Sequence, residues 1–216
     1  MRILFLMGIA VLLVGCKDGA AGSDAKSKDL TPAQSIPSRS KEERSFDQKL
    51  AGIHDAWMGT AWDFSGMSRT PQQGAIACGY FVTTTLEQAG VELERVRLAQ
   101  AASETMILAT TPEETVRRFS NASLESFLKA LRAQGEGYYV VGLDSHTGFL
   151  KVDRDGKVVF IHSGPGRGVV RQAPADAVEL AESRYRVTGK LVPPTMQSES
   201  GEAQPPLTEI RDAGVL

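Results

Sequence analysis

The sequence is poor in the residues that most often carry chemistry. Of its 216 residues, only two are cysteines and three are histidines. So few thiol and imidazole ligands make a metal centre unconvincing, with zinc as a minor alternative, and the residues predict no cofactor. The formal net charge is -2, without any dense run of lysine or arginine. A nucleic-acid backbone needs a strongly basic surface, so no nucleic-acid partner is expected.

Long apolar runs are also missing, apart from a short one at the N-terminus. Residues 3–14 are apolar but too few to span a membrane. The following LVGC, residues 13–16, resembles the lipobox of bacterial lipoproteins. That resemblance implies a signal peptide over residues 1–15, a lipid on Cys16, and a membrane anchor on the periplasmic face of the cell envelope. Lys17 replaces the aspartate of an inner-membrane retention signal, which favours the outer membrane. The alternative is an ordinary secretory signal with a chance cysteine.

The composition divides the rest of the chain into three parts. Residues 16–42 are polar and almost free of aliphatic side chains, which predicts a disordered tether. Residues 43–192 carry enough apolar residues for one domain. Residues 193–216 contain two proline pairs and predict a loose tail.

Within the domain, helical periodicity comes first and alternating strands follow. Apolar residues spaced along a helix predict helices at 46–57, at 76–89 with Gly90 as its end, and within 112–133, where Ser123 is a cap for the turn that begins at Leu124. Runs rich in Val, Tyr, Phe and Ile predict strands at 138–143, 146–152, 157–163 and 184–191, with a short helix near 175–182. Helices followed by an antiparallel sheet predict the α+β class. The glycine-rich stretch 163–168 lacks the context of a phosphate loop and is predicted to be a flexible rim loop, with Arg167 a candidate contact for a substrate carboxylate.

Cys78 is predicted to lie in the first turn of the second helix. If Cys16 carries a lipid, Cys78 is the only free thiol, and no structural disulfide can form. Unpaired N–H groups and the helix dipole at this position favour thiolate over thiol, as a nucleophile requires. The alternative is that Cys78 is a small apolar residue that only packs in the core.

Two of the three histidines lie on predicted neighbouring strands, and the turn between these strands decides whether they meet. A three-residue loop at 154–156, ending in a left-handed glycine, pairs Asp153 with Lys157 and puts His146 and His162 on one face. A two-residue turn puts them on opposite faces. The third histidine, His54, is expected to be a surface or packing residue of the first helix.

Four short motifs carry a resemblance to a known family. GTAWDFSG (59–66), ACGYFV (77–82), SHTGFL (145–150) and VFIHS (159–163) resemble, in order and type, the NlpC-type family of papain-like cysteine peptidases. The resemblance covers roughly residues 45–190. It implies a papain-like fold in which N-terminal helices pack on an antiparallel sheet.

The resemblance also implies roles for single residues. Cys78 would be the nucleophile, His146 the general base and His162 the residue that orients it. Trp62 stands where the family has a tyrosine that lines the site. Substrate or oxyanion contacts are also expected from Tyr80 and from Gln72, although an exposed turn is an alternative for Gln72.

Two departures bear on specificity. The family's aspartate before the cysteine is Ala77 here, and the serine after it is Gly79. The chain between Cys78 and His146 is also longer than expected, so the segment 112–133 is interpreted as an insertion that covers or reshapes the cleft.

The expected function is a cysteine hydrolase of the cell envelope that cleaves a peptide amide, with a cell-wall peptide as substrate, through an acyl-enzyme. One alternative is an amidase or acyltransferase on another acyl group. The other is a non-catalytic lipoprotein that binds wall fragments or a partner.

Overall fold

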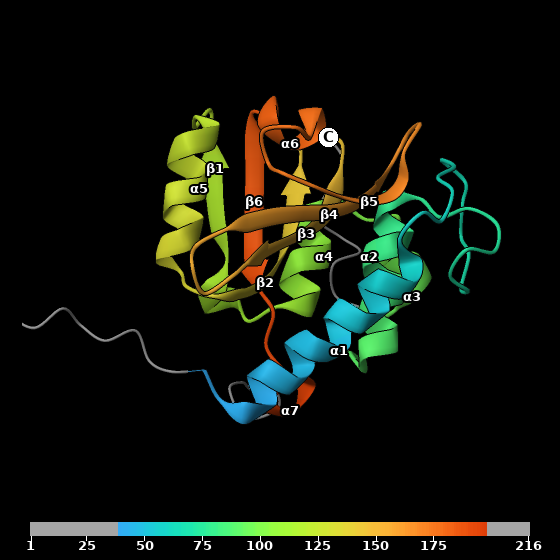
Figure 1. Cartoon of the computed structure of the whole chain (residues 1–216), viewed down its shortest axis with the longest axis horizontal. Helices are drawn as coiled ribbons and strands as arrows, with labels where there is room; N and C mark the ends of the chain where they lie inside the picture. Colours follow the sequence, from blue (N-terminus) through green and yellow to red (C-terminus); the bar gives the residue numbers. More distant parts are fainter. Residues whose placement is uncertain (1–38, 198–216) are drawn as a thin grey trace, which may run out of the picture. The chain divides into compact units, whose positions relative to one another are not determined.

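The computed structural model describes residues 39–197 of the chain. In this part, six strands form one antiparallel sheet in the order β1-β6-β2-β3-β4-β5, with helices on both faces (Figure 1). The strands are β1 Arg117–Ser120, β2 Gly137–Leu143, β3 Thr147–Val152, β4 Val158–Gly164, β5 Gly168–Gln172 and β6 Tyr185–Lys190. The helices are α1 Lys41–Trp57, α2 Cys78–Ala89, α3 Arg95–Ala99, α4 Ser103–Thr110, α5 Leu124–Ala133, α6 Val178–Ala181 and α7 Pro194–Gln197, with a 3-10 turn at Glu113–Thr115. The predicted α+β class is therefore confirmed.

Alternating side chains of the sheet build two separate cores. Tyr138, Val140 and Phe149 face one core, which α1, α2 and α4 cover. Tyr139 and Leu150 face the other core, where the apolar side of α5 and the short α6 pack. Each large side chain buried in this way contributes roughly 2 kcal/mol of transfer free energy. Because both faces of β2 are buried, its sequence is a continuous apolar run rather than an alternation of apolar and polar residues.

The first helix begins earlier than predicted. Ser40 caps α1, and its hydroxyl accepts the N–H of Glu43 while the Glu43 carboxylate accepts the N–H of Ser40. The end of the predicted tether, residues 39–42, thus belongs to the folded domain. Residues 16–38 of the tether, the predicted signal peptide and the lipidation site Cys16 lie outside the described residues. At the other end, α7 is a helical turn inside the predicted loose tail.

The segment between α2 and β2 differs most from the sequence prediction. The helical start predicted at residue 112 is only a 3-10 turn, followed by the edge strand β1, whereas the helix predicted after the cap Ser123 is confirmed as α5 from Leu124. Four residues pair as β1 because β6 offers them an antiparallel partner, with Phe119 opposite Arg186. Helices α3 and α4 are only 5 and 8 residues long, and the sequence pattern did not indicate them.

The hairpin of β3 and β4 has the three-residue loop that the histidine pair requires. Leu150 pairs with Phe160 and Val152 pairs with Val158. The same register places Asp153 opposite Lys157, and the Asp153 N–H donates to the Lys157 carbonyl. Gly156 is left-handed, with φ +78°, and its N–H donates to the Asp153 carbonyl. The predicted register is confirmed, although the Asp153 carboxylate forms its ion pair with Lys151 on its own strand.

No helix within residues 39–197 is both long enough and apolar enough to cross a membrane.

Candidate active site

Cys78 is the first residue of α2, and the chain before it is fastened on two sides. The N–H of Ile76 donates to the Ala61 carbonyl, and that of Ala77 donates to Gly66. From the sheet, the buried Ser163 hydroxyl donates to the Ile76 carbonyl at 2.7 Å. These contacts fix the start of α2 against β4. The first N–H groups of a helix have no partner within it, so the start of α2 presents donors next to the thiol.

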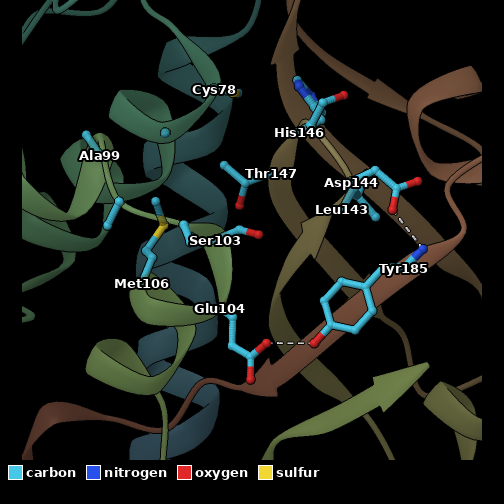
Figure 2. A pocket seen from close by; sticks show the side chains of 14 residues that line it. Cys78, Ala99, Ser103, Glu104, Met106, Leu143, Asp144, His146, Thr147 and Tyr185 are labelled. Atoms are coloured by element: carbon cyan, nitrogen blue, oxygen red, sulfur yellow. Dashed lines mark hydrogen bonds between the residues drawn. The ribbon is translucent and has the colours of Figure 1, made fainter. Parts of the chain in front are cut away.

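The thiol lies in a cleft of about 510 Å³. One wall is formed by residues between Ala99 and Met106, from the end of α3 to the start of α4, and the other by the β2–β3 turn and Tyr185. In Figure 2, Cys78 and His146 lie at one end of this cleft, and the hydrogen bond between Glu104 and Tyr185 lies at the other. The cleft therefore joins the predicted nucleophile and the predicted base.

His146 and His162 are in direct contact. The Nε2 atom of His146 lies 2.8 Å from Nδ1 of His162, with the rings nearly perpendicular. On its other side, His162 contacts Oε1 of Gln172 through Nε2 at 2.7 Å. His162 is fully buried and stacks on Phe160, with 4.3 Å between ring centroids. The three side chains form one continuous hydrogen-bonded chain that leads to the cleft.

Gly148 makes room for His162. A Cβ atom at this position would lie 2.7 Å from the Ile161 carbonyl oxygen and 2.9 Å from Cβ of His162. Both distances are shorter than real Cβ contacts allow. Gly148 therefore allows β4 to approach closely at this point.

The ionisation of the site differs from the sequence prediction. Burial raises the pKa of the Cys78 thiol, and the N–H groups of Thr147, Gly79 and Cys78 offset part of that rise. Burial lowers the pKa of His146 to about 4, and the neighbouring His162 adds to this lowering. The pKa of His162 is also lowered by burial. A thiolate favoured by the helix start was expected, but desolvation dominates, so thiol and imidazole are both neutral at pH 7.

The other three candidate site residues do not line the cleft. Tyr80 is buried, and its hydroxyl accepts a hydrogen bond from Gln100. Gln72 is exposed in a turn with φ +58°, tied to Met58 and Thr60 at the end of α1. Trp62 is half-buried on the loop between α1 and α2.

Local packing requires a glycine at position 79. A Cβ atom on Gly79 would lie 2.2 Å from the carbonyl oxygen of Ala99. Helix α3 therefore packs directly on the first turn of α2, which brings its C-terminal end to the cleft. The segment 112–133, interpreted as covering or reshaping the cleft, does not line it, since α5 packs in the opposite core; residues between Ala99 and Met106 line the cleft instead.

Sequence reasoning missed Gln172. Residues 163–168 were predicted to form a flexible rim loop, but β4 extends to Gly164 and β5 begins at Gly168. The alternation of GVVRQ was the available signal, since it places Gln172 two positions from the partner of His162 on the same face.

Arg167 forms an ion pair with Glu179 at 3.5 Å. Asp144 accepts the N–H groups of Arg184 and Tyr185.

His54 is a packing residue. Its ring is fully buried among Phe81, Tyr138 and Phe149, with a centroid 4.6 Å from that of Phe149. Neither ring nitrogen has a hydrogen-bond partner. Burial lowers the pKa of His54 to about 3. His54 takes no part in the cleft.

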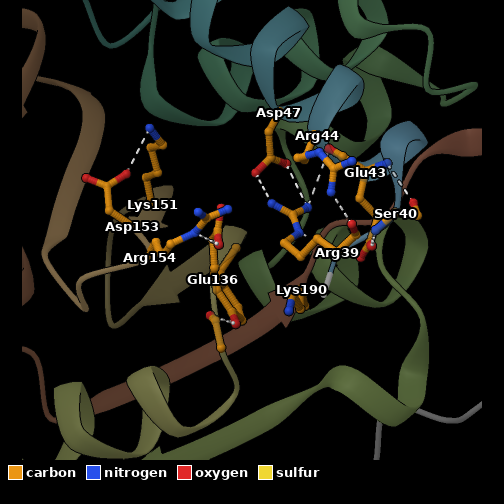
Figure 3. A network of polar contacts seen from close by, with 12 residues as sticks. Arg39, Ser40, Glu43, Arg44, Asp47, Glu136, Lys151, Asp153, Arg154 and Lys190 are labelled. Atoms are coloured by element: carbon orange, nitrogen blue, oxygen red, sulfur yellow. Dashed lines mark hydrogen bonds and ion pairs between the residues drawn. The ribbon is translucent and has the colours of Figure 1, made fainter. Parts of the chain in front are cut away.

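A second polar network lies at the start of α1 (Figure 3). The Arg39 guanidinium binds the Asp47 carboxylate and the Glu43 carbonyl, and Arg154 pairs with Glu136 nearby. The guanidinium and the carboxylates here already pair with one another, so the network secures α1. Within residues 39–197, no three His, Cys, Asp or Glu side chains are grouped so that they could hold a metal ion.

The chain matches none of the protein-family models and none of the curated proteins with which it was compared.

Proposed function

We propose that this protein is a cysteine hydrolase that cleaves a peptide amide, with Cys78 as nucleophile, His146 as general base and His162 as the residue that orients His146. The motif resemblance to NlpC-type peptidases and a papain-like arrangement of the fold belong to this proposal. The observation that carries it is the hydrogen bond of 2.8 Å between His146 and His162, with His146 lining the same cleft as Cys78. A buried filler cysteine does not require such a partner.

The proposed reaction starts from neutral groups. The Cys78 sulfur attacks the amide carbonyl carbon while its proton passes to His146. Negative charge on the carbonyl oxygen is stabilised by N–H groups at the start of α2. His146 then gives the proton to the leaving amine, and a thioester remains on Cys78. Water, deprotonated by His146, hydrolyses the thioester and releases a carboxylic acid and the free thiol.

The substrate class follows from the proposed location. A lipid on Cys16 and an outer-membrane anchor would hold the domain on the periplasmic face, where the available amides include those of cell-wall peptides. Metabolic labelling with an alkyne-tagged fatty acid tests the anchor: the wild-type chain should be labelled and Cys16→Ser should not. Label retained in Cys16→Ser would contradict the lipid site.

The function is tested by incubating the protein with soluble cell-wall peptide fragments and following products and protein mass by mass spectrometry. Cleaved peptide and a transient mass increase on Cys78 are expected, and both should vanish in Cys78→Ala. Products joined to an added amine would indicate a transferase. Binding of fragments with neither cleavage nor a Cys78 adduct would overturn the hydrolase and favour the non-catalytic wall-binding protein.

A further inference from the structure

We propose that Gln172 is a positioning residue that fixes the tautomer of both histidines, so that the Nδ1 atom of His146 carries the lone pair available to Cys78. The catalytic purpose of this arrangement rests on the proposed function. The tautomers themselves follow from the hydrogen bonds alone, and they are testable without any substrate.

The orientation of the Gln172 amide is set from outside the site. Its Nε2 group donates to the Asp176 carbonyl at 3.1 Å, which turns Oε1 toward His162. Arg167 also approaches this oxygen, with Nη1 at 3.5 Å. An amide oxygen only accepts hydrogen bonds. The Nε2 atom of His162, 2.7 Å away, must therefore carry the proton.

The tautomer of His146 follows from that of His162. His162 is fully buried, and burial lowers its pKa, so its ring is neutral at pH 7 and its Nδ1 atom has a lone pair. The contact of 2.8 Å with His146 then requires a proton on Nε2 of His146. The ring of His146 is neutral as well, because its pKa is about 4. Its Nδ1 atom is therefore left unprotonated, which is the state that a general base needs.

Without a hydrogen-bond acceptor at position 172, these two tautomers are no longer fixed. His162 is then free to carry its proton on Nδ1 and donate to Nε2 of His146. In that arrangement the neutral His146 holds its proton on Nδ1, and it has no lone pair for the thiol. An acceptor that holds a catalytic imidazole in one tautomer is known to control rate strongly, even where the geometry is unchanged.

The fold holds Gln172 in place. Gln172 pairs with Phe160 in the β4–β5 ladder, two positions from His162. The Asp176 carbonyl is fixed by a turn in which the N–H of Asp176 donates to Ala173. The ion pair of Arg167 and Glu179 links the tip of the β4–β5 hairpin to α6. Gln172 is thus held on a strand rather than on a mobile loop.

The test uses the full chain purified in detergent, with ¹⁵N-labelled histidine rings. The chain has only three histidines, so ring signals can be assigned with single His variants. At pH 7, both His146 and His162 are expected as Nε2–H tautomers. In Gln172→Met, His162 should show Nδ1–H signal, and kcat on a cleaved peptide should fall about 10- to 100-fold with KM within twofold.

Two further variants separate tautomer control from packing. Gln172→Glu keeps an acceptor, so it should restore the Nε2–H tautomers and most of kcat. Arg171→Met is the matched control, because Arg171 is the neighbouring residue on β5 and pairs with Asp55 instead. This variant should leave both tautomers unchanged.

The inference is overturned if either histidine is an Nδ1–H tautomer in the wild-type chain, or if Gln172→Met leaves both signals unchanged. Failure of the proposed function looks different: the tautomers and their dependence on Gln172 would be present while no peptide is cleaved by any variant.

Discussion

Nε2 of His146 and Nδ1 of His162 lie 2.8 Å apart, although the two residues are 16 positions apart in the chain. The contact depends on the three-residue loop between β3 and β4. A loop shorter by one residue would turn one ring to the opposite face of the sheet, because successive side chains of a strand alternate. The catalytic proposal therefore rests on a turn that lies at the far end of both strands.

The first prediction concerns Gly148. Gly148→Ala should lower the free energy of unfolding by about 1–3 kcal/mol, because the new Cβ meets the backbone of β4 and Cβ of His162. Urea unfolding measures this loss, and the His146–His162 contact should weaken with it. Gly52→Ala is the control, since nothing lies within 4 Å of its Cβ position in α1. The free energy of unfolding of Gly52→Ala should rise by about 0.5–1 kcal/mol. Equal effects of the two substitutions would contradict the packing argument.

The second prediction concerns the Cys78 thiol. Since burial raises its pKa, the rate of alkylation by iodoacetamide should rise at higher pH in the folded chain than in the urea-unfolded chain. Rates measured between pH 6 and pH 10 in both states give the two midpoints. A fast plateau below pH 8 in the folded chain would instead indicate a preformed thiolate–imidazolium pair.

The third prediction concerns acid stability and His54. Its pKa is about 3 in the folded protein and near 6.5 when unfolded, because burial disfavours the cation and Arg171 adds repulsion that Asp55 offsets in part. The unfolded chain therefore binds the extra proton between pH 6.5 and pH 3, and stability falls as the pH drops through this window. His54→Met removes this contribution.

Urea unfolding at pH 7 and pH 5 tests this difference. From pH 7 to pH 5, the wild-type chain should lose about 2 kcal/mol more than His54→Met does. His146 and His162 are present in both proteins, so their contribution cancels. Equal losses would mean that His54 finds a partner or water when it is protonated.

The fourth prediction concerns the hydrogen bond that links the sheet to the start of α2, where the proposed nucleophile Cys78 lies. Ser163→Ala leaves the buried Ile76 carbonyl without its donor, which should cost about 1–3 kcal/mol of unfolding free energy. Because this bond fixes the start of α2, kcat should fall as well. Ser68→Ala removes a hydroxyl that bonds only within an exposed loop, and it should cost less than about 1 kcal/mol with kcat unchanged. A stability loss in Ser163→Ala without a change in kcat would show that the bond does not position Cys78.

Local signals in the sequence were enough for much of the fold. Ser123 as a cap predicted the start of α5, Gly90 predicted the end of α2, and runs rich in Val, Tyr, Phe and Ile predicted the strands β2, β3, β4 and β6. The turn at residues 154–156 allowed two registers, and the structure has the one that brings the histidines together. Periodicity, caps and turn residues act over a few positions, so short-range patterns contain this information.

Features that depend on contacts between distant segments were decided only by the tertiary structure. β1 is a strand because β6 pairs with it, and Gln172 meets His162 because β5 pairs with β4. The pKa of Cys78 is raised rather than lowered because surrounding segments remove water from the thiol. By itself, the sequence determined which residues are available for chemistry and which face of a strand they share. Only the packed structure decided which of them touch and in which state of protonation, because desolvation and hydrogen-bond partners come from parts of the chain far away in sequence.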